Sequence, residues 1–150
     1  MEQNLEYGEK ELKLFRIWAK ASKALFDNVT KDIMAHGLTL ENFMVMELLY
    51  SKGPHYIQEI SEKLDIPSGS ITYVVNKLEK KEFVKREIED ENKRYCKVIL
   101  TKKGQDLFNN IFPKHVKMIV ENLAVLDEGQ KEQLTALLKS VGLAAEELKA

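Results

Sequence analysis

The feature that most constrains the fold is a pair of predicted helices joined by a tight turn in the middle of the chain. Apolar residues at helical spacing predict a short helix over residues 57–64, and Pro67 ends it because proline disfavours a helical residue before it. Ser68 is the expected N-cap of the next helix, which runs to about Lys81. Its apolar residues share one face and its other face is polar and basic. Together these segments predict a helix-turn-helix.

Two strand-like runs follow this second helix. Apolar and polar residues alternate over residues 83–88 and 95–101, and the charged hexapeptide 89–94 joins them. Such a pattern is typical of a β-hairpin with a polar tip.

Longer helices are predicted on either side of this central segment. An N-terminal helix with two apolar stripes ends near Gly37, and Thr39 is the expected cap of an almost wholly apolar, hence central, helix over 40–50. After the hairpin, residues 102–124 predict a helix capped by Thr101 and kinked or split at Pro113, and a last helix begins after residue 127.

Charge and composition set the class of protein. The chain has 23 Lys and Arg against 24 Asp and Glu, which by itself argues mildly against a nucleic-acid partner. Between Lys63 and Gly104, however, 11 basic residues face 7 acidic ones. The single cysteine, the polar N-terminus and the lack of an 18-residue apolar run predict a cytoplasmic protein with no membrane partner.

The polar face of the 68–81 helix suits DNA, because an α-helix fits the major groove and its N-terminal residues reach base edges there. The predicted DNA-binding residues are Ser68, Ser70, Thr72, Tyr73, Asn76, Lys77, Lys93 and Arg94. Asn76 can pair with adenine, and Lys93 and Arg94 at the hairpin tip are placed for an adjacent minor groove. Further phosphate charge comes from Lys80, Lys81, Lys85 and Arg86.

These residues also carry a family resemblance. The segments I-x-x-I-S-E-K-L, S-G-S-I-T-Y-V-V-N-K-L-E-K-K and V-I-L-T-K-K-G resemble the winged helix of the MarR family of bacterial repressors. The Leu-Thr-x-x-Gly pattern of that family is matched by Leu100, Thr101 and Gly104, and its wing arginine by Arg94. The 68–75 segment resembles most closely a quinone-responsive branch. The resemblance extends over nearly the whole chain.

Two departures from the family pattern stand out. Asn92 replaces an aspartate that would orient Arg94, a role for which Asp90 is the alternative. Glu82 replaces a glycine in the turn before the first wing strand, and a left-handed residue there is strained without glycine, so the turn is expected to differ.

The resemblance implies a mainly α fold with a small β-hairpin wing, a winged helix-turn-helix with N- and C-terminal dimerisation helices. Residues 1–150 are then a single domain, in which 1–36 and 105–150 form a homodimer and 37–104 bind DNA. The apolar residues of the last helix, which need a partner, agree with this. A two-fold dimer places two recognition helices about one DNA turn, roughly 34–36 Å, apart, so the operator is predicted to be a pseudo-palindrome.

Family members bind small, often phenolic ligands between the dimer helices and the DNA-binding lobe. The corresponding effector-binding candidates are Phe15, Trp18, His36, Phe43, Met46, Tyr50 and His115, although aromatic and methionine residues at helical spacing are more often core. Cys96 is more simply a small strand residue than a redox sensor, despite the nearby Lys97 and Arg94.

No cofactor, metal or catalytic site is expected. The three histidines lack a ligand spacing, and the motifs of serine hydrolases, phosphate-binding loops and zinc proteases are missing. The chain is therefore predicted to be a DNA-binding repressor that a small effector releases. The alternative is a winged-helix protein-interaction module that does not bind DNA.

Overall fold

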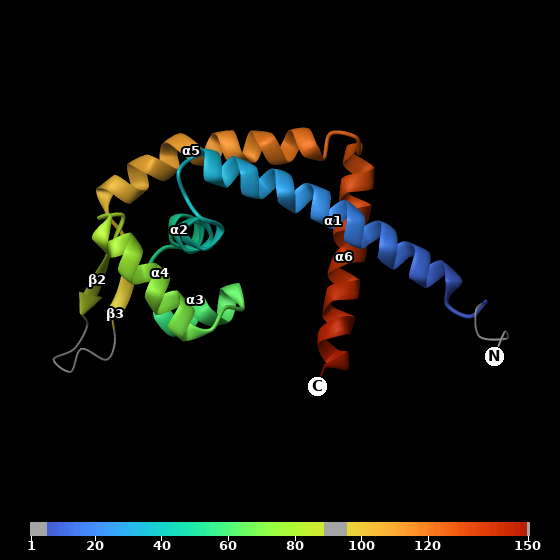
Figure 1. The fold of residues 1–150 in the computed structure, drawn as a ribbon, viewed down its shortest axis with the longest axis horizontal. Helices are drawn as coiled ribbons and strands as arrows, with labels where there is room; N and C mark the ends of the chain where they lie inside the picture. The colour runs from blue at the N-terminus through green and yellow to red at the C-terminus, as the bar shows by residue number, and fades with distance from the viewer. Residues whose placement is uncertain (1–5, 89–95, 150) are drawn as a thin grey trace. The chain divides into compact units, whose positions relative to one another are not determined.

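The computed structural model describes residues 6–88 and 96–149. The chain divides into two compact units, Met1–Val116 and Lys117–Ala150. The first unit contains α1, α2, α3 and α4 and the strands, and α5 begins in it (Figure 1). The helices are α1 Glu9–Ala35, α2 Leu40–Lys52, α3 Ile57–Leu64, α4 Ser68–Lys80, α5 Lys102–Asn122 and α6 Glu128–Leu148. No helix in this described part is long and apolar enough to cross a membrane.

The sheet contains the predicted hairpin and one additional strand. β2 (Val84–Ile88) and β3 (Cys96–Leu100) pair antiparallel, with Val84 opposite Leu100, as the alternation predicted. β1 (His55–Tyr56) pairs with the other edge of β3, giving the order β1-β3-β2. A two-residue strand has no alternation to detect, which is why the sequence pattern missed it.

A buried histidine links the turn after α2 to α3. The Nδ1 atom of His55 lies 2.6 Å from the carbonyl oxygen of Gly53, which only accepts hydrogen bonds, so Nδ1 carries the proton. Its Nε2 atom then accepts from the Lys63 ammonium at 2.8 Å. One neutral imidazole thus joins the turn after α2 to the last turn of α3.

The core lies around α2. Asn42 and five apolar side chains of α2 are buried, which confirms its central position, and α2 contacts α1, α3, α4 and β3. Thr39 caps α2 as predicted, since its Oγ1 accepts the Asn42 N–H at 3.2 Å. The buried apolar residues are Ile33, Leu38, Phe43, Val45, Met46, Leu48, Leu49, Ile60, Ile71, Val74, Val75, Leu78, Val84, Val98, Phe108 and Ile111.

Three local expectations need correction. Ser68 is the first residue of α4, while Pro67 takes the cap position without a side-chain hydrogen bond; its fixed φ, −53° here, suits a helix start. Pro113 lies inside one continuous helix α5, so of the two predicted outcomes the split is wrong and the kink stays a prediction. Glu82 is left-handed with φ 64°, so the turn does not avoid that conformation.

Hydrogen bonds explain how a glutamate holds the left-handed turn after α4. The Phe83 N–H bonds the Leu78 carbonyl and the Glu82 N–H bonds the Glu79 carbonyl, both at 3.0 Å, the pattern of a Schellman C-cap. The Thr101 hydroxyl also donates to the Glu82 carbonyl at 2.5 Å. Tertiary contacts therefore hold the turn without the glycine.

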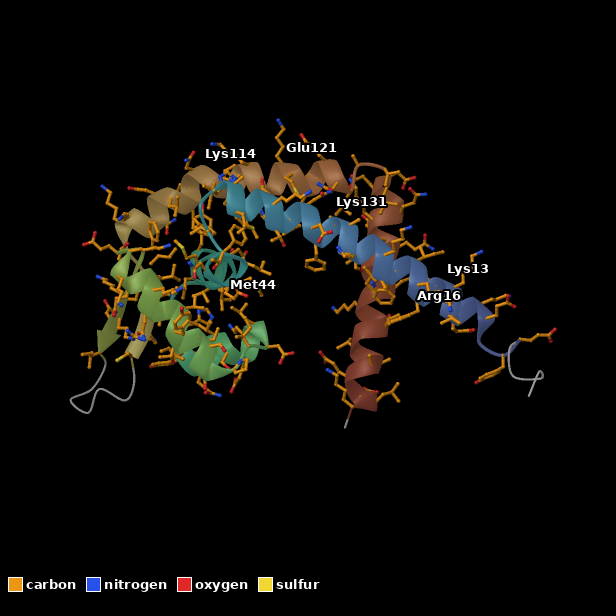
Figure 2. All side chains as sticks on the ribbon, viewed as in Figure 1. Lys13, Arg16, Met44, Lys114, Glu121 and Lys131 are labelled. Carbon is orange, nitrogen blue, oxygen red and sulfur yellow. The ribbon has the colours of Figure 1, made fainter. Side chains whose placement is uncertain are left out.

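The long terminal helices contrast with this core. Ile33 is the one residue of α1 that is buried, and Phe15 and Phe26 are 66% and 62% exposed. Figure 2 shows the side chains of α1 along its length, with Lys13 and Arg16 labelled in its N-terminal half. The second unit has the same character, because no residue of α6 is buried.

Candidate DNA-binding surface

The two faces of α4 separate as the sequence predicts. Ile71, Val74, Val75 and Leu78 are buried against the core. The opposite face exposes Ser68, Ser70, Tyr73, Asn76 and Lys77. Thr72 is half-buried, and its hydroxyl donates to the Ser68 carbonyl at 3.0 Å. One helix thus carries all six predicted DNA-binding residues that lie in the described part of the chain. Lys93 and Arg94 lie outside the described residues.

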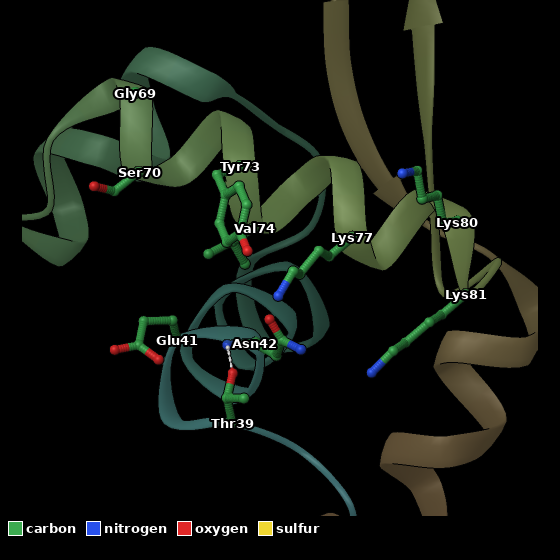
Figure 3. A pocket seen from close by; sticks show the side chains of 10 residues that line it. All are labelled: Thr39, Glu41, Asn42, Gly69, Ser70, Tyr73, Val74, Lys77, Lys80 and Lys81. Carbon is green, nitrogen blue, oxygen red and sulfur yellow. Dashed lines mark hydrogen bonds between the residues drawn. The ribbon is translucent and has the colours of Figure 1, made fainter.

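A groove of about 650 Å³ runs along one flank of α4, between this helix and the N-terminal turn of α2 (Figure 3). Tyr73 and Lys77 project from α4 toward α2, and the Lys77 ammonium lies 4.6 Å from the centre of the Tyr73 ring. This cation–π contact holds the ammonium beside the groove. The lining residues are Thr39, Glu41, Asn42, Gly69, Ser70, Tyr73, Val74, Lys77, Lys80 and Lys81.

The other flank of α4 faces the wing strand β2. Arg86 reaches from β2 to α4, where its guanidinium donates to Glu79 at 2.9 Å and to Asn76 at 2.7 Å. Lys85, the preceding residue, is exposed. The two basic residues of β2 therefore differ: one is held by α4 and the other faces solvent.

A close backbone contact fixes the end of α4 to the start of α5. The Thr101 hydroxyl accepts the Gly104 N–H at 3.1 Å, and the Thr101 N–H donates to the Phe83 carbonyl at 3.0 Å. A Cβ at Gly104 would lie 2.2 Å from that carbonyl oxygen. The Thr-x-x-Gly pattern thus has a structural role, since it joins the recognition helix and the wing to α5.

Several predicted effector-binding residues meet in an aromatic cluster. Phe43 lies 4.5 Å from His115 and 5.2 Å from Phe108, measured between ring centres, and Tyr50 packs on Phe108 and Phe112, both at 5.4 Å. The remaining candidates lie apart from these ring contacts. Met46 is fully buried in the core, while Phe15 and Trp18 lie exposed on α1.

Asp32 completes this cluster and was not predicted. Its carboxylate accepts from His115 Nδ1 at 2.9 Å and lies 3.8 Å from His36 Nε2. Asp32 precedes the buried Ile33 and stands four residues before His36. An acidic residue at the edge of an apolar stripe, one helical turn from a histidine, is the sequence signal that could have identified it. The pair joins α1 to α5 beside Phe43.

Cys96 begins β3 opposite Ile88 and is half-buried. This position suits a small strand residue. Its redox behaviour remains a prediction.

Comparisons with known proteins agree with this geometry. The model of the MarR family matches residues 38–95. The chain is 44% identical to the HTH-type transcriptional regulator MhqR of Bacillus subtilis, over 93% of this chain and 96% of that protein. It is 35% identical to the uncharacterized HTH-type transcriptional regulator YkoM of the same organism, over 97% and 94% of the two chains.

Solved structures show the same fold. Sco3205, a MarR family transcriptional regulator from Streptomyces coelicolor solved in complex with DNA, superimposes with a TM-score of 0.82 at 21% identity, over 91% of each chain. AbsC, from the same organism, gives a TM-score of 0.80 at 20% identity, over 93% of this chain and 95% of that one. The predicted winged helix-turn-helix is confirmed.

Proposed function

Because this chain belongs to the MarR family, we propose that it is a homodimeric repressor that leaves a pseudo-palindromic operator when a small phenolic or quinone-like effector binds. The broader function is established by the relatives: the chain is a DNA-binding transcriptional regulator, and such regulators are not enzymes. The homodimer, the effector and the residues that contact each partner are the proposed part, as is a cytoplasmic location.

The observation that carries the DNA-binding role is the exposed polar and basic face of α4. Ser70, Tyr73, Asn76 and Lys77 face solvent from a helix whose other side is anchored in the core. Lysine side chains around the groove supply positive charge for phosphates, and hydroxyl and amide groups supply base contacts. A rigid helix with one face anchored in the core and the other face polar and basic suits the major groove.

The apolar residues of the terminal helices support the homodimer. Leu134, Leu137, Leu138 and Val141 are between 40% and 57% exposed on α6 and recur at helical spacing. An exposed apolar stripe of this kind marks an interaction site. A second copy of the same chain offers a matching stripe, which is the isologous contact of a two-fold dimer.

The aromatic cluster supports an effector site near Phe43 and His115. Rings stack on phenols and quinones, and an imidazole whose Nδ1 donates to Asp32 leaves Nε2 to accept a hydrogen bond from a phenolic hydroxyl. The effector lowers DNA affinity only if it binds more tightly to a dimer whose recognition helices are wrongly spaced.

The experiment is a fluorescence anisotropy titration with DNA from upstream of the protein's own gene, over a range of salt concentrations. Lys77→Ala is expected to reduce the slope of log affinity against log salt by about 0.9, the value for one lost phosphate contact. Lys139→Ala, an exposed lysine on α6, is the matched control and leaves the slope unchanged.

Effectors are tested in the same titration by adding catechols and quinones. Release of the operator supports the quinone-responsive branch, and retention with every compound rejects it. If the wild-type protein shows no preference for any DNA sequence, the alternative of a protein-interaction module stands.

A further inference from the structure

The contact between Arg86 and Asn76 indicates a role for Arg86 other than binding a phosphate. Sequence alone places Arg86 among the phosphate-binding cations. In the structure its two terminal nitrogens reach Glu79 and Asn76, at 2.9 and 2.7 Å. These two residues are three apart on α4, so they lie side by side on the flank that faces β2.

The pairing neutralises much of the charge of Arg86. Its side chain is 24% exposed and the Glu79 side chain 42%, so the ion pair lies at the rim of the α4–β2 contact. A guanidinium already held by a carboxylate and an amide has fewer donors left for a phosphate. Arg86 is therefore poorly suited to be a phosphate contact, in contrast to the exposed Lys85.

The same contact fixes which way the Asn76 amide faces. A guanidinium only donates hydrogen bonds, so the Asn76 atom next to it must be the carbonyl oxygen. The amide nitrogen is then turned away from Arg86. Its two N–H donors have no acceptor within residues 6–88 and 96–149. The exposed side chain thus presents donors on the face of α4 that suits DNA.

We propose that Arg86 is a positioning residue that holds Asn76 as a hydrogen-bond donor, so that Asn76 reads the N7 acceptor of a purine in the major groove. Adenine recognition by both ends of an amide needs the oxygen to accept from the adenine amino group. Here a charged donor already takes one of the two lone pairs of that oxygen and holds it toward β2. Guanine, which presents N7 and O6 as neighbouring acceptors, is the preferred base. This inference rests on the proposed DNA-binding role of α4.

The test compares base preference rather than affinity alone. Wild type, Asn76→Ala, Arg86→Ala and Lys85→Ala are each titrated against operators substituted at every position. Asn76→Ala and Arg86→Ala are expected to lose about tenfold preference at the same base pair of each half-site. Replacing that purine by its 7-deaza analogue lowers wild-type binding about equally. It adds no further loss in Arg86→Ala, because the contact is already absent.

Lys85→Ala is the matched charge control. It is expected to keep the base preference and to reduce the salt slope by about 0.9 if Lys85 meets a phosphate. Asn76→Asp is the second variant: it keeps an acceptor for Arg86, removes the donor and loses preference at the same pair. Far-UV circular dichroism and thermal unfolding verify that each variant folds.

The outcomes distinguish the positioning role of Arg86 from the DNA-reading role of α4. A uniform loss of affinity for all sequences in Arg86→Ala, with a reduced salt slope, would make Arg86 a phosphate contact and overturn the positioning role. Unchanged binding in Arg86→Ala would overturn it as well. If the wild-type protein has no base preference at any position, the proposed DNA-reading function of α4 fails, and this inference fails with it.

Discussion

The winged lobe and the long terminal helices use apolar residues in opposite ways. Residues 38–111 bury their apolar side chains within one chain, around α2 and α4. The α1 and α6 helices are just as regular, yet only Ile33 is buried on α1 and no residue is buried on α6. A lobe with its own core can hold α4 rigidly, while separate helices remain free to form the proposed contact with a second copy of the chain.

The largest effect is expected from breaking the proposed dimer contact of α6. Leu137→Glu places a charge in the apolar stripe, where each chain loses about 2 kcal/mol of burial. Two copies per dimer then give a loss of about 4 kcal/mol, which weakens dimerisation more than 100-fold. Analytical ultracentrifugation at micromolar concentration is expected to show monomers, and operator affinity falls with it.

Ala136→Glu is the matched control for this substitution. It introduces the same charge into the same exposed helix, about half a turn around the helix from the centre of the apolar stripe. It is expected to leave the sedimentation coefficient unchanged. If the Leu137→Glu protein still dimerises, α6 is not part of the interface. The exposed apolar residues of α6 then have no role in binding a second copy of the chain.

A somewhat smaller effect is expected within the lobe from Gly104→Ala. The added methyl group would lie 2.2 Å from the Phe83 carbonyl oxygen, a backbone atom that is held by the Thr101 N–H. Overpacking at such a site destabilises by about 3 kcal/mol. Urea unfolding at fixed protein concentration measures the change, since the stability of a dimer depends on concentration.

Gly69→Ala provides the control within the same lobe. Its Cβ would meet no atom within 4 Å, and alanine favours a helix over glycine by about 1 kcal/mol. The same chemical change is therefore expected to stabilise slightly at residue 69 and to destabilise strongly at residue 104. Equal effects at the two glycines would show that the α4–α5 junction is not rigid.

Most of the lobe could be predicted because its signals are local. Periodicity gave the helices, alternation gave β2 and β3, and Thr39 and Thr101 cap helices as expected. β1 was missed because it is a pairing of two residues with β3, and nothing in those two residues encodes the partner. Local patterns describe elements, whereas pairing depends on the assembled sheet.

The candidate site was predictable in position but not in contacts. The polar face of α4 follows from its sequence, yet the engagement of Asn76 by Arg86 depends on the approach of β2 to α4. Asp32 was missed for the same reason, since its partner His115 lies 83 residues away. Charge counting treats every basic residue alike, and only the structure separates Arg86 from Lys85.

The smallest expected effect tests how firmly the end of α4 is held. Glu82 adopts φ 64°, which costs a residue with a Cβ about 1 kcal/mol relative to glycine. Glu82→Gly is therefore expected to stabilise the lobe by about 1 kcal/mol in urea unfolding. The lost contact with Lys103, 3.9 Å away and exposed, contributes little. Glu82→Ala keeps the Cβ and is expected to leave stability unchanged.

If Glu82→Gly instead destabilises the lobe, the hydrogen bonds from Thr101 and to Glu79 do not suffice to hold the turn. The end of α4 is then held in part by the restricted backbone conformations of a residue with a Cβ at position 82. In that case the buried core does not hold α4 by itself.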